Sequence, residues 1–232
     1  MRYSFTWKGE TSTSYGIRLT EMPQVIRPEE RVKHIVIPGR SGELTETEDD
    51  DIYESYIQTI PIIVDNIADV KAAEAWLRGN GYVTFCNESN RKQQARIINA
   101  VTFRKHSKNS SWYEADVQFY CDPLKEQLSE SAIEITTNGG TITNPGDIAS
   151  RPLITITGSG DITIRINDRA IVLSSAVSGW KVDSDLEWVI SGTTPLPNVY
   201  TGQFPRIRTG QSAVQWTGSV TKLTIQPRWR YL

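Results

Sequence analysis

Alternation of apolar and polar positions dominates the first half of the sequence. Tyr3, Phe5 and Trp7 alternate with polar residues at the start of the chain. The same period of two recurs in the segments 17–19 and 82–86, and the apolar segments 95–103 and 112–120 are interpreted as two more strands. Because a period of two places successive side chains on opposite faces of a sheet, each of these segments is predicted to be a half-buried strand.

The stretch around residues 35–51 interrupts this pattern. The β-branched run Ile35–Ile37 must end at Pro38-Gly39, a pair that favours a tight turn with positive φ. The following segment is too poor in apolar residues to be core, and it carries Glu43, Glu46, Glu48, Asp49, Asp50 and Asp51. Residues 53–64 are apolar again, and Pro61 favours an extended conformation there. We therefore predict two strands joined by a projecting, negatively charged arm.

The arm is open to two interpretations. It is either a solvated hairpin end without a partner, as most acidic loops are, or a segment that reaches onto a neighbouring subunit. The physical chemistry of the sequence does not choose between them.

One helix is predicted in the chain. Asp65 and Asn66 are candidate caps, and apolar residues recur at spacings of three and four from Ile67 to Leu77. The sequence Gly79-Asn80-Gly81 ends the pattern. We expect this stripe to pack against the sheet.

The second half of the chain consists of short apolar runs at a spacing near ten residues, separated by turn residues. Such spacing without a helical stripe indicates a β-sandwich. Gly158-Ser159-Gly160 and Thr217-Gly218-Ser219 are interpreted as hairpin turns. Phe119 to Pro123 ends the first half and a polar linker follows, so we predict two domains, 1–127 and 128–232.

Composition excludes some function classes. The near balance of 25 basic and 27 acidic residues argues against a general nucleic-acid-binding protein. We expect a chain that is made in the cytosol and stays soluble, because no segment approaches the roughly 20 apolar residues of a membrane span. Cys86 and Cys121 lie in apolar, strand-like contexts and are expected to be buried, reduced thiols.

No arrangement typical of catalysis or of cofactor binding is visible. His34 and His106 have no second histidine or cysteine at a spacing typical of metal ligands. The carboxylates at 49–51 could attract calcium, but they lack the alternation and the central glycine of a calcium loop, so solvent exposure is favoured. We predict no catalytic residue, no metal and no cofactor.

Aromatic and basic residues gather near the C-terminus. Trp188 and Trp216 lie in alternating segments and are expected in the core, whereas Trp180 and Trp229 are the candidates for exposure and for stacking on a sugar ring. Every charged residue after position 200 is basic: Arg206, Arg208, Lys222, Arg228 and Arg230. One hypothesis is that the acidic arm docks against this basic surface on a neighbouring chain.

Several phrases of the sequence resemble a known family. Ile37-Pro38-Gly39-Arg40-Ser41-Gly42 is similar to the I-P-G-R-D-G signature of the distal tail proteins of long-tailed, non-contractile bacteriophages, with Ser41 in place of the usual Asp. The phrases 119–123, 151–160, 204–205 and 223–230 also resemble that family, so the likeness spans nearly the whole chain.

The resemblance implies an architectural, non-enzymatic protein of the virion, located at the tail tip and assembled in the host cytoplasm. The N-terminal domain would close into a homohexameric ring, and the C-terminal sandwich would be similar to galectins and carbohydrate-binding modules. The implied partners are the tail tube protein, the tail-associated hub protein and the tape-measure protein, with a receptor-binding protein or a carbohydrate as a further partner. DNA would pass through the lumen without specific contact, and no membrane is involved. The subunit-interface candidates are Pro38, Gly39, Arg40, Gly42, Glu46, Glu48, Asp49, Asp50 and Asp51.

Two other functions stay open at this point. The chain could be a carbohydrate-binding module that recognises host cell-wall polysaccharide, which would remain monomeric. A hydrolase is disfavoured because the sequence shows no pair of nucleophile and base.

Overall fold

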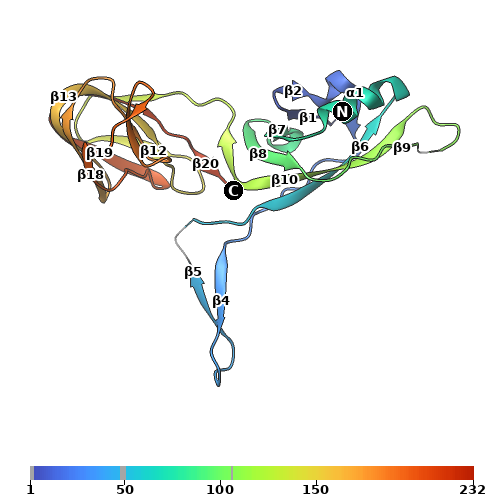
Figure 1. Cartoon of the computed structure of the whole chain (residues 1–232), viewed down its shortest axis with the longest axis horizontal. Coiled ribbons are helices and arrows are strands. Elements are labelled where there is room, and N and C mark those ends of the chain that lie inside the picture. The colour runs from blue at the N-terminus through green and yellow to red at the C-terminus, as the bar shows by residue number, and fades with distance from the viewer. Residues whose placement is uncertain (1–2, 48–50, 106) are drawn as a thin grey trace. The chain divides into compact units, whose positions relative to one another are not determined.

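The computed structural model of the chain describes residues 3–47, 51–105 and 107–232. The chain divides into two compact units, residues 1–128 with Leu232 and residues 129–231. The predicted boundary between 127 and 128 lies one residue from this division. Most elements are β-strands, and the α-helix found among the described residues lies in the first unit (Figure 1). The prediction of a mainly β fold with one helix is therefore confirmed.

The first unit contains ten strands, one α-helix and two short 3₁₀ helices within the described residues. Their bounds are β1 Phe5–Trp7, β2 Glu10–Thr11, η1 Ser12–Tyr15, β3 Ile17–Leu19, β4 Val32–Val36, β5 Glu43–Thr47, β6 Tyr56–Val64, α1 Ile67–Trp76, β7 Asn80–Phe85, η2 Cys86–Glu88, β8 Arg91–Ile97, β9 Arg104–Lys105 and β10 Tyr113–Gln127.

An antiparallel sheet with the strand order β2-β1-β7-β8-β10-β6-β3 forms the body of this unit. The alternation seen in the sequence places one set of side chains in the core, where Trp7 and Phe119 are fully buried and their ring centroids lie 5.3 Å apart. Helix α1 contributes Ala73 and Trp76 to the same core. The ring of Trp76 stacks on Tyr15 at 4.5 Å.

The predicted helix is present and its cap is identified. The side chain of Asn66 accepts a hydrogen bond from the backbone N–H of Ala68 at 3.1 Å, which satisfies one of the unpaired donors of the first turn. Ile67 was expected to be part of the buried stripe, but its side chain is exposed.

Strand β10 differs from the expected ending of the first half. It continues through Pro123 to Gln127, because its pairing with β8 is interrupted between Cys121 and Lys125 and resumes afterwards. Proline lacks an N–H donor and is tolerated in a sheet at such an irregularity. The predicted linker therefore begins inside a strand. The predicted strand 95–103 is displaced along the chain, since β8 begins at Arg91 and ends at Ile97.

The second unit contains ten strands. Their bounds are β11 Ile133–Ile135, β12 Gly140–Asn144, β13 Leu153–Ile166, β14 Arg169–Ala176, β15 Lys181–Asp183, β16 Trp188–Ser191, β17 Thr194–Pro195, β18 Tyr200–Gly202, β19 Gly210–Gln226 and β20 Arg230–Tyr231.

Two long antiparallel strands, β13 and β19, are paired along most of their length and fold the sheet into two layers. In one layer, the first half of β13 pairs with β15 and the second half of β19 pairs with β11. In the other layer, the second half of β13 pairs with β14 and the first half of β19 pairs with β12. The register shifts near Gly158 and between Ser159 and Thr163, where the strands bend. The glycines at 158–160 and 217–219 therefore lie inside long strands, and their interpretation as hairpin turns was wrong.

Close backbone approach explains two of these glycines. A Cβ atom at Gly158 would lie 2.3 Å from the carbonyl oxygen of Ser219, and one at Gly218 would lie 2.2 Å from that of Asp161. Side chains essentially never tolerate such distances, so the bend requires glycine at both positions.

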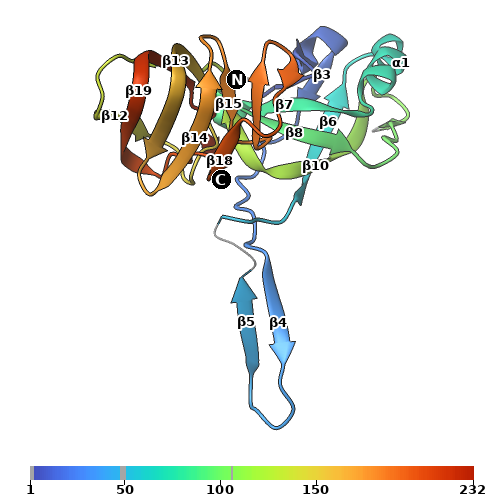
Figure 2. The same cartoon turned by 60° about the vertical axis from the view of Figure 1, so that its left-hand side comes forward.

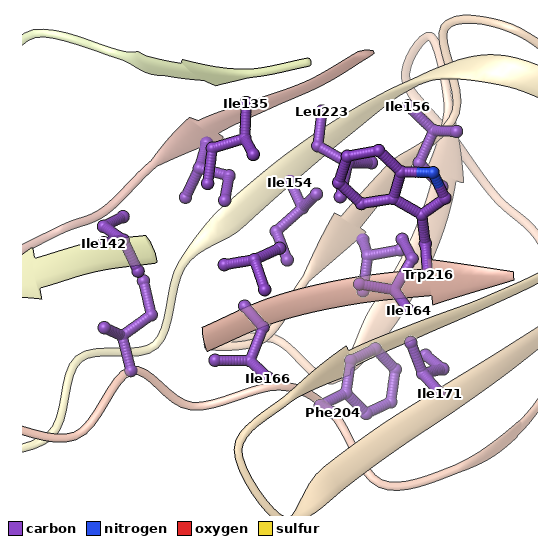
Figure 3. Close-up of a cluster of buried hydrophobic side chains, with 14 of the residues drawn as sticks. Ile135, Ile142, Ile154, Ile156, Ile164, Ile166, Ile171, Phe204, Trp216 and Leu223 are labelled. Atoms are coloured by element: carbon purple, nitrogen blue, oxygen red, sulfur yellow. The ribbon is translucent and has the colours of Figure 1, made fainter. Parts of the chain in front are cut away.

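One hydrophobic core fills the space between the two layers. Ile154, Ile156 and Leu223 from one layer pack in the same buried cluster as Ile164 and Trp216 from the other (Figure 3). The inward residues of β13 are nearly all isoleucine, whose branched side chain suits a pleated surface. The predicted β-sandwich is therefore confirmed.

Candidate assembly surface

Strands β4 and β5 form a hairpin that carries the I-P-G-R phrase at its tip. Five residue pairs run from Val32–Thr47 at the base to Val36–Glu43 at the tip. The backbone N–H of Arg40 donates to the carbonyl of Ile37 at 3.1 Å, and Gly39 has a φ of 84°. Proline followed by a glycine of positive φ is the sequence requirement of a type II turn. The predicted tight turn at Pro38-Gly39 is therefore confirmed.

The hairpin is a sheet of its own. Figures 1 and 2 show β4 and β5 extending away from the sheet of the first unit. Its base is fastened to the segment that precedes β6 by two backbone hydrogen bonds, from the N–H of Arg31 to the carbonyl of Ile52 at 2.9 Å and from the N–H of Glu54 to the carbonyl of Glu29 at 2.8 Å. An ion pair between Arg31 and Glu54, with 2.6 Å between Nε and Oε1, lies at the same place.

The projecting arm is thus confirmed, but its composition differs from the prediction. The acidic segment is not a loop between two strands of the main sheet; part of it is β5, which returns from the tip and pairs with β4. Two regular strands form here because the turn at 37–42 fixes their register.

Both faces of this hairpin expose apolar side chains. Val36 is 71% exposed and Leu44 is 43% exposed, and they lie on opposite faces because Val36 is in register with Glu43 and Leu44 with Ile35. Two-stranded hairpins without a packed face are marginally stable in water. This hairpin therefore has the features of a segment that is covered by another surface.

The predicted interface residues fall into three groups. Pro38, Gly39, Arg40 and Gly42 are exposed at the tip, and Glu46 is exposed on β5. Asp51 is exposed at the base with a φ of 67°. Glu48, Asp49 and Asp50 lie outside the described residues.

Folding places basic side chains of β4 next to the acidic side chains of β5. Strand β4 brings Lys33 into register with Glu46, and Nδ1 of His34 lies 3.3 Å from a carboxylate oxygen of Glu43. The acidic strand therefore has a lysine and a histidine of its own hairpin beside it, which its sequence by itself does not reveal.

The basic residues after position 200 were predicted to form a basic surface, and several of them are paired with carboxylates of their own unit. Arg208 binds Asp168 at 3.0 Å, Lys222 binds Glu134 at 2.7 Å, and Nη2 of Arg230 lies 3.7 Å from a carboxylate oxygen of Asp185. Arg206 is half-buried and has interactions of its own. These acidic partners come from distant parts of the sequence, so the run of basic residues does not by itself indicate a uniformly basic surface.

Arg228 makes the most enclosed of these ion pairs. Its guanidinium donates to both oxygens of Asp183, at 2.7 and 2.9 Å. Burial raises the pKa of Asp183, but hydrogen bonds from Arg228 and from the backbone of Leu186 and Asp185, with the Arg228 charge, outweigh it and lower this pKa below 3.8. The pair therefore fixes the C-terminal segment to the β15–β16 turn.

The predictions for Trp229 and Trp188 were wrong, and Trp180 is half-buried. Trp229 is only 6% exposed and lies in the sandwich core, and Trp180 packs against that core. Trp188 was expected to be buried but is 47% exposed, whereas Trp216 is buried as expected. A stacking platform built from Trp180 and Trp229 is therefore excluded.

The structure shows little that could support catalysis. Within the described ranges, no group of three or more His, Cys, Asp or Glu side chains could hold a metal ion. Cys121 is buried, and burial raises its pKa to about 12, so its thiol is protonated at neutral pH. Cys86 is half-buried, so the prediction that it is buried was wrong. Both cysteines are free thiols. His106 lies outside the described residues.

The described part of the chain contains no helix that is both long enough and apolar enough to cross a membrane.

Solved structures include a protein with a similar fold. No family model matches the sequence, and no curated protein matches it. The crystal structure of the SPP1 Dit protein, described as a paradigm of the hub adsorption apparatus in phages that infect Gram-positive bacteria, matches with a TM-score of 0.76. The alignment covers 99% of each chain at 16% identity. The chain therefore has the fold of this Dit protein, and the resemblance inferred from the sequence phrases is confirmed at the level of fold.

Proposed function

We propose that this chain is a structural component of a bacteriophage tail, a distal tail protein that joins the tail tube to the host-adsorption device. The observation that carries the proposal is the fold match, which extends over both units and includes nearly every residue of each chain. The sequence phrases 37–42 and 223–230 support the same assignment independently of the fold.

The hairpin gives this role a physical basis. Its exposed apolar residues, Val36 and Leu44, have no cover within their own unit, and its base is fixed while its tip is free. A segment of this kind is stabilised when a neighbouring copy covers it. Because the hairpin and the surface that receives it are different parts of the chain, the contact is head-to-tail, and such contacts close into a ring when the rotation allows it.

The assembly proposed is a homohexameric ring at the tail tip of the virion. Its axial partners would be the tail tube protein, the tail-associated hub protein and the tape-measure protein, and DNA would pass through the lumen without sequence-specific contact. The near-neutral net charge of −2 is compatible with a protein that lets DNA pass rather than binding it.

Light scattering of the purified chain tests the ring. We expect a particle with a mass near six times 26.1 kDa, and rings in electron micrographs of the same sample. A chain that stays monomeric at every concentration, with no rings in the micrographs, contradicts this assembly.

A hairpin variant tests the contact. Val36→Asp should shift the mass to that of a single chain, because burying a charged group in place of valine removes about 2 kcal/mol or more per interface. The melting temperature of the single chain should not change, since Val36 does not belong to either core.

The matched control is Val177→Asp, the same change at an exposed valine of the second unit. It should assemble like the unmodified chain. If both variants assemble equally well, the hairpin is not the contact, whereas a ring lost in both indicates a non-specific effect of the added charge.

A further inference from the structure

A shallow groove on the outer face of the sandwich is not explained by assembly through the hairpin. It has a volume of about 460 Å³ and lies over the paired strands β13 and β19, beside Asn138 and Gly139. This volume is within the range of about 300–1,000 Å³ that is usual for ligand sites.

The register of the two strands determines which side chains line this groove. Ile162, Ile164 and Ile166 point into the core, so Thr163 and Arg165 between them point outward. Thr163 is in register with Thr217, and Arg165 with Gln215. Directly paired residues share a face, so two hydroxyls, an amide and a guanidinium lie together.

The turn at Asn138-Gly139, beside these side chains, is held against β19 by hydrogen bonds. Asn138 donates from its side chain to the carbonyl of Trp216 at 2.8 Å and accepts from the N–H of Trp216 at 2.9 Å. The backbone N–H of Gly139 donates to Val214 at 3.0 Å. Because these contacts fix the 138–139 turn against β19, the groove is formed before any ligand binds.

Arg165 is the charged residue among the side chains that line the groove. In contrast to the side chains of Arg208, Arg228 and Arg230 in the same unit, its guanidinium has no ion-pair or hydrogen-bond partner in the described part of the chain. No acidic side chain lines the groove among the described residues. Guanidinium groups bind carboxylate and phosphate in a bidentate geometry.

The other lining groups select for hydroxyl-rich ligands. Threonine hydroxyls and the glutamine amide both donate and accept hydrogen bonds, as sugar hydroxyls do. The Thr163–Thr217 and Arg165–Gln215 pairs are two residues apart along each strand, which separates them by about 7 Å. A ligand that uses both pairs must carry polar groups over that distance, and a free anion is too small.

We infer that this groove binds an anionic glycan, with Arg165 on its acidic group and Thr163, Gln215 and Thr217 on its hydroxyls. This site is distinct from the hairpin, and it does not depend on ring assembly. The acidic group is a carboxylate or a phosphate, both of which present the oxygens that Arg165 recognises.

Isothermal titration of the full chain with three defined probes tests the inference. The probes are trigalacturonate, which carries carboxylates, a trimer of glycerol phosphate, and neutral galactotriose. We expect at least one anionic probe to bind about tenfold more tightly than the neutral one, the loss expected when one charge-assisted hydrogen bond is absent. Which anionic probe binds identifies the acidic group.

Two variants locate the site. Arg165→Gln should weaken the binding of the anionic probe about tenfold and leave that of galactotriose unchanged. Arg208→Gln removes an equal charge from the same unit outside the groove, and it should bind as the unmodified chain does. Melting curves establish that both variants are folded.

Three results would overturn the inference. They are no binding of any probe at millimolar concentration, equal affinity for anionic and neutral probes, and anionic binding that Arg165→Gln leaves intact. None of these results affects the mass measurement that tests the ring.

Discussion

The bend of the two long sandwich strands offers a sharp test of how this fold is determined, through the substitution Gly218→Ala. Gly218 has a φ of 90°, and a Cβ atom there would lie 2.2 Å from the carbonyl oxygen of Asp161. That oxygen belongs to the backbone of the paired strand β13, so it cannot rotate away as a flexible side chain would. Either the strands separate at the bend or the alanine is strained.

The expected cost combines three effects. Alanine at positive φ costs about 1–2 kcal/mol. Forcing extra volume into a packed site costs about 1–3 kcal/mol, and the reduced entropy of the unfolded chain returns about 0.4–1 kcal/mol. We therefore expect the second unit to lose about 3 kcal/mol of unfolding free energy. For a unit of this size, 1 kcal/mol corresponds to a shift in melting temperature of about 4 °C.

Gly160→Ala is a matched control in the same bend. Gly160 has a φ of 84°, but no heavy atom lies within 4 Å of the site of its Cβ atom. Its alanine variant therefore carries the conformational cost without the clash and should lose about 1 kcal/mol. The difference of about 2 kcal/mol between the two variants isolates the contact between the strands.

Differential scanning calorimetry of the full chain measures these losses, because the transition that both variants shift is that of the sandwich. If Gly218→Ala unfolds at the same temperature as Gly160→Ala, the close approach of the strands does not limit stability. The explanation of the bend given above is then refuted.

Two further predictions concern titrating groups. Because burial raises the pKa of Cys121 from 9.0 to about 12, the unfolded chain loses this proton first, and the stability of the first unit should fall as pH rises through that window. When unfolding free energy is measured with urea between about pH 8 and pH 11, that of the Cys121→Ala variant should fall less steeply with pH than that of the unmodified chain. Equal slopes for the two chains contradict the assignment. The second prediction is that Arg228→Gln costs about 2 kcal/mol at neutral pH, since it leaves the enclosed Asp183 carboxylate without its cation. The pKa of Asp183 is lowered, so its ion pair adds stability above pH 3.8, and this stability is lost as the pH falls through the pKa of Asp183 in the folded chain. The difference in unfolding free energy between the Arg228→Gln variant and the unmodified chain should therefore shrink in acid. A difference that stays constant with pH would argue against the ion pair.

Local signals in the sequence were sufficient where the structure depends on neighbouring residues. Helix α1 begins after Asn66 because its side chain caps the first turn, and that signal is contained within a few residues. The turn at Pro38-Gly39 is of the same kind. The phrase around it also carried the resemblance in fold that the comparison later confirmed.

Signals of the same kind failed where the partner is distant in sequence. In a sequence, a glycine of a hairpin turn cannot be distinguished from a glycine that lets two paired strands approach closely. At Gly218 the close neighbour is the backbone of Asp161, which lies on another strand. Trp229 was misjudged for a related reason. Its flanking arginines suggested exposure, but Arg228 and Arg230 are neutralised by Asp183 and Asp185, which leaves the indole free to enter the core.

The candidate groove was not visible in the sequence at all. Thr163, Arg165, Gln215 and Thr217 are ordinary outward positions of two strands, and only the pairing of β13 with β19 brings them together. The sequence by itself determined the β-rich character of both units, the helix, the arm and the likeness to a tail protein, because each of these follows from short-range patterns of polarity and turn residues. The tertiary structure decided which glycines bend strands, which cations are paired and where a ligand could bind, because those properties depend on contacts between residues that are far apart along the chain.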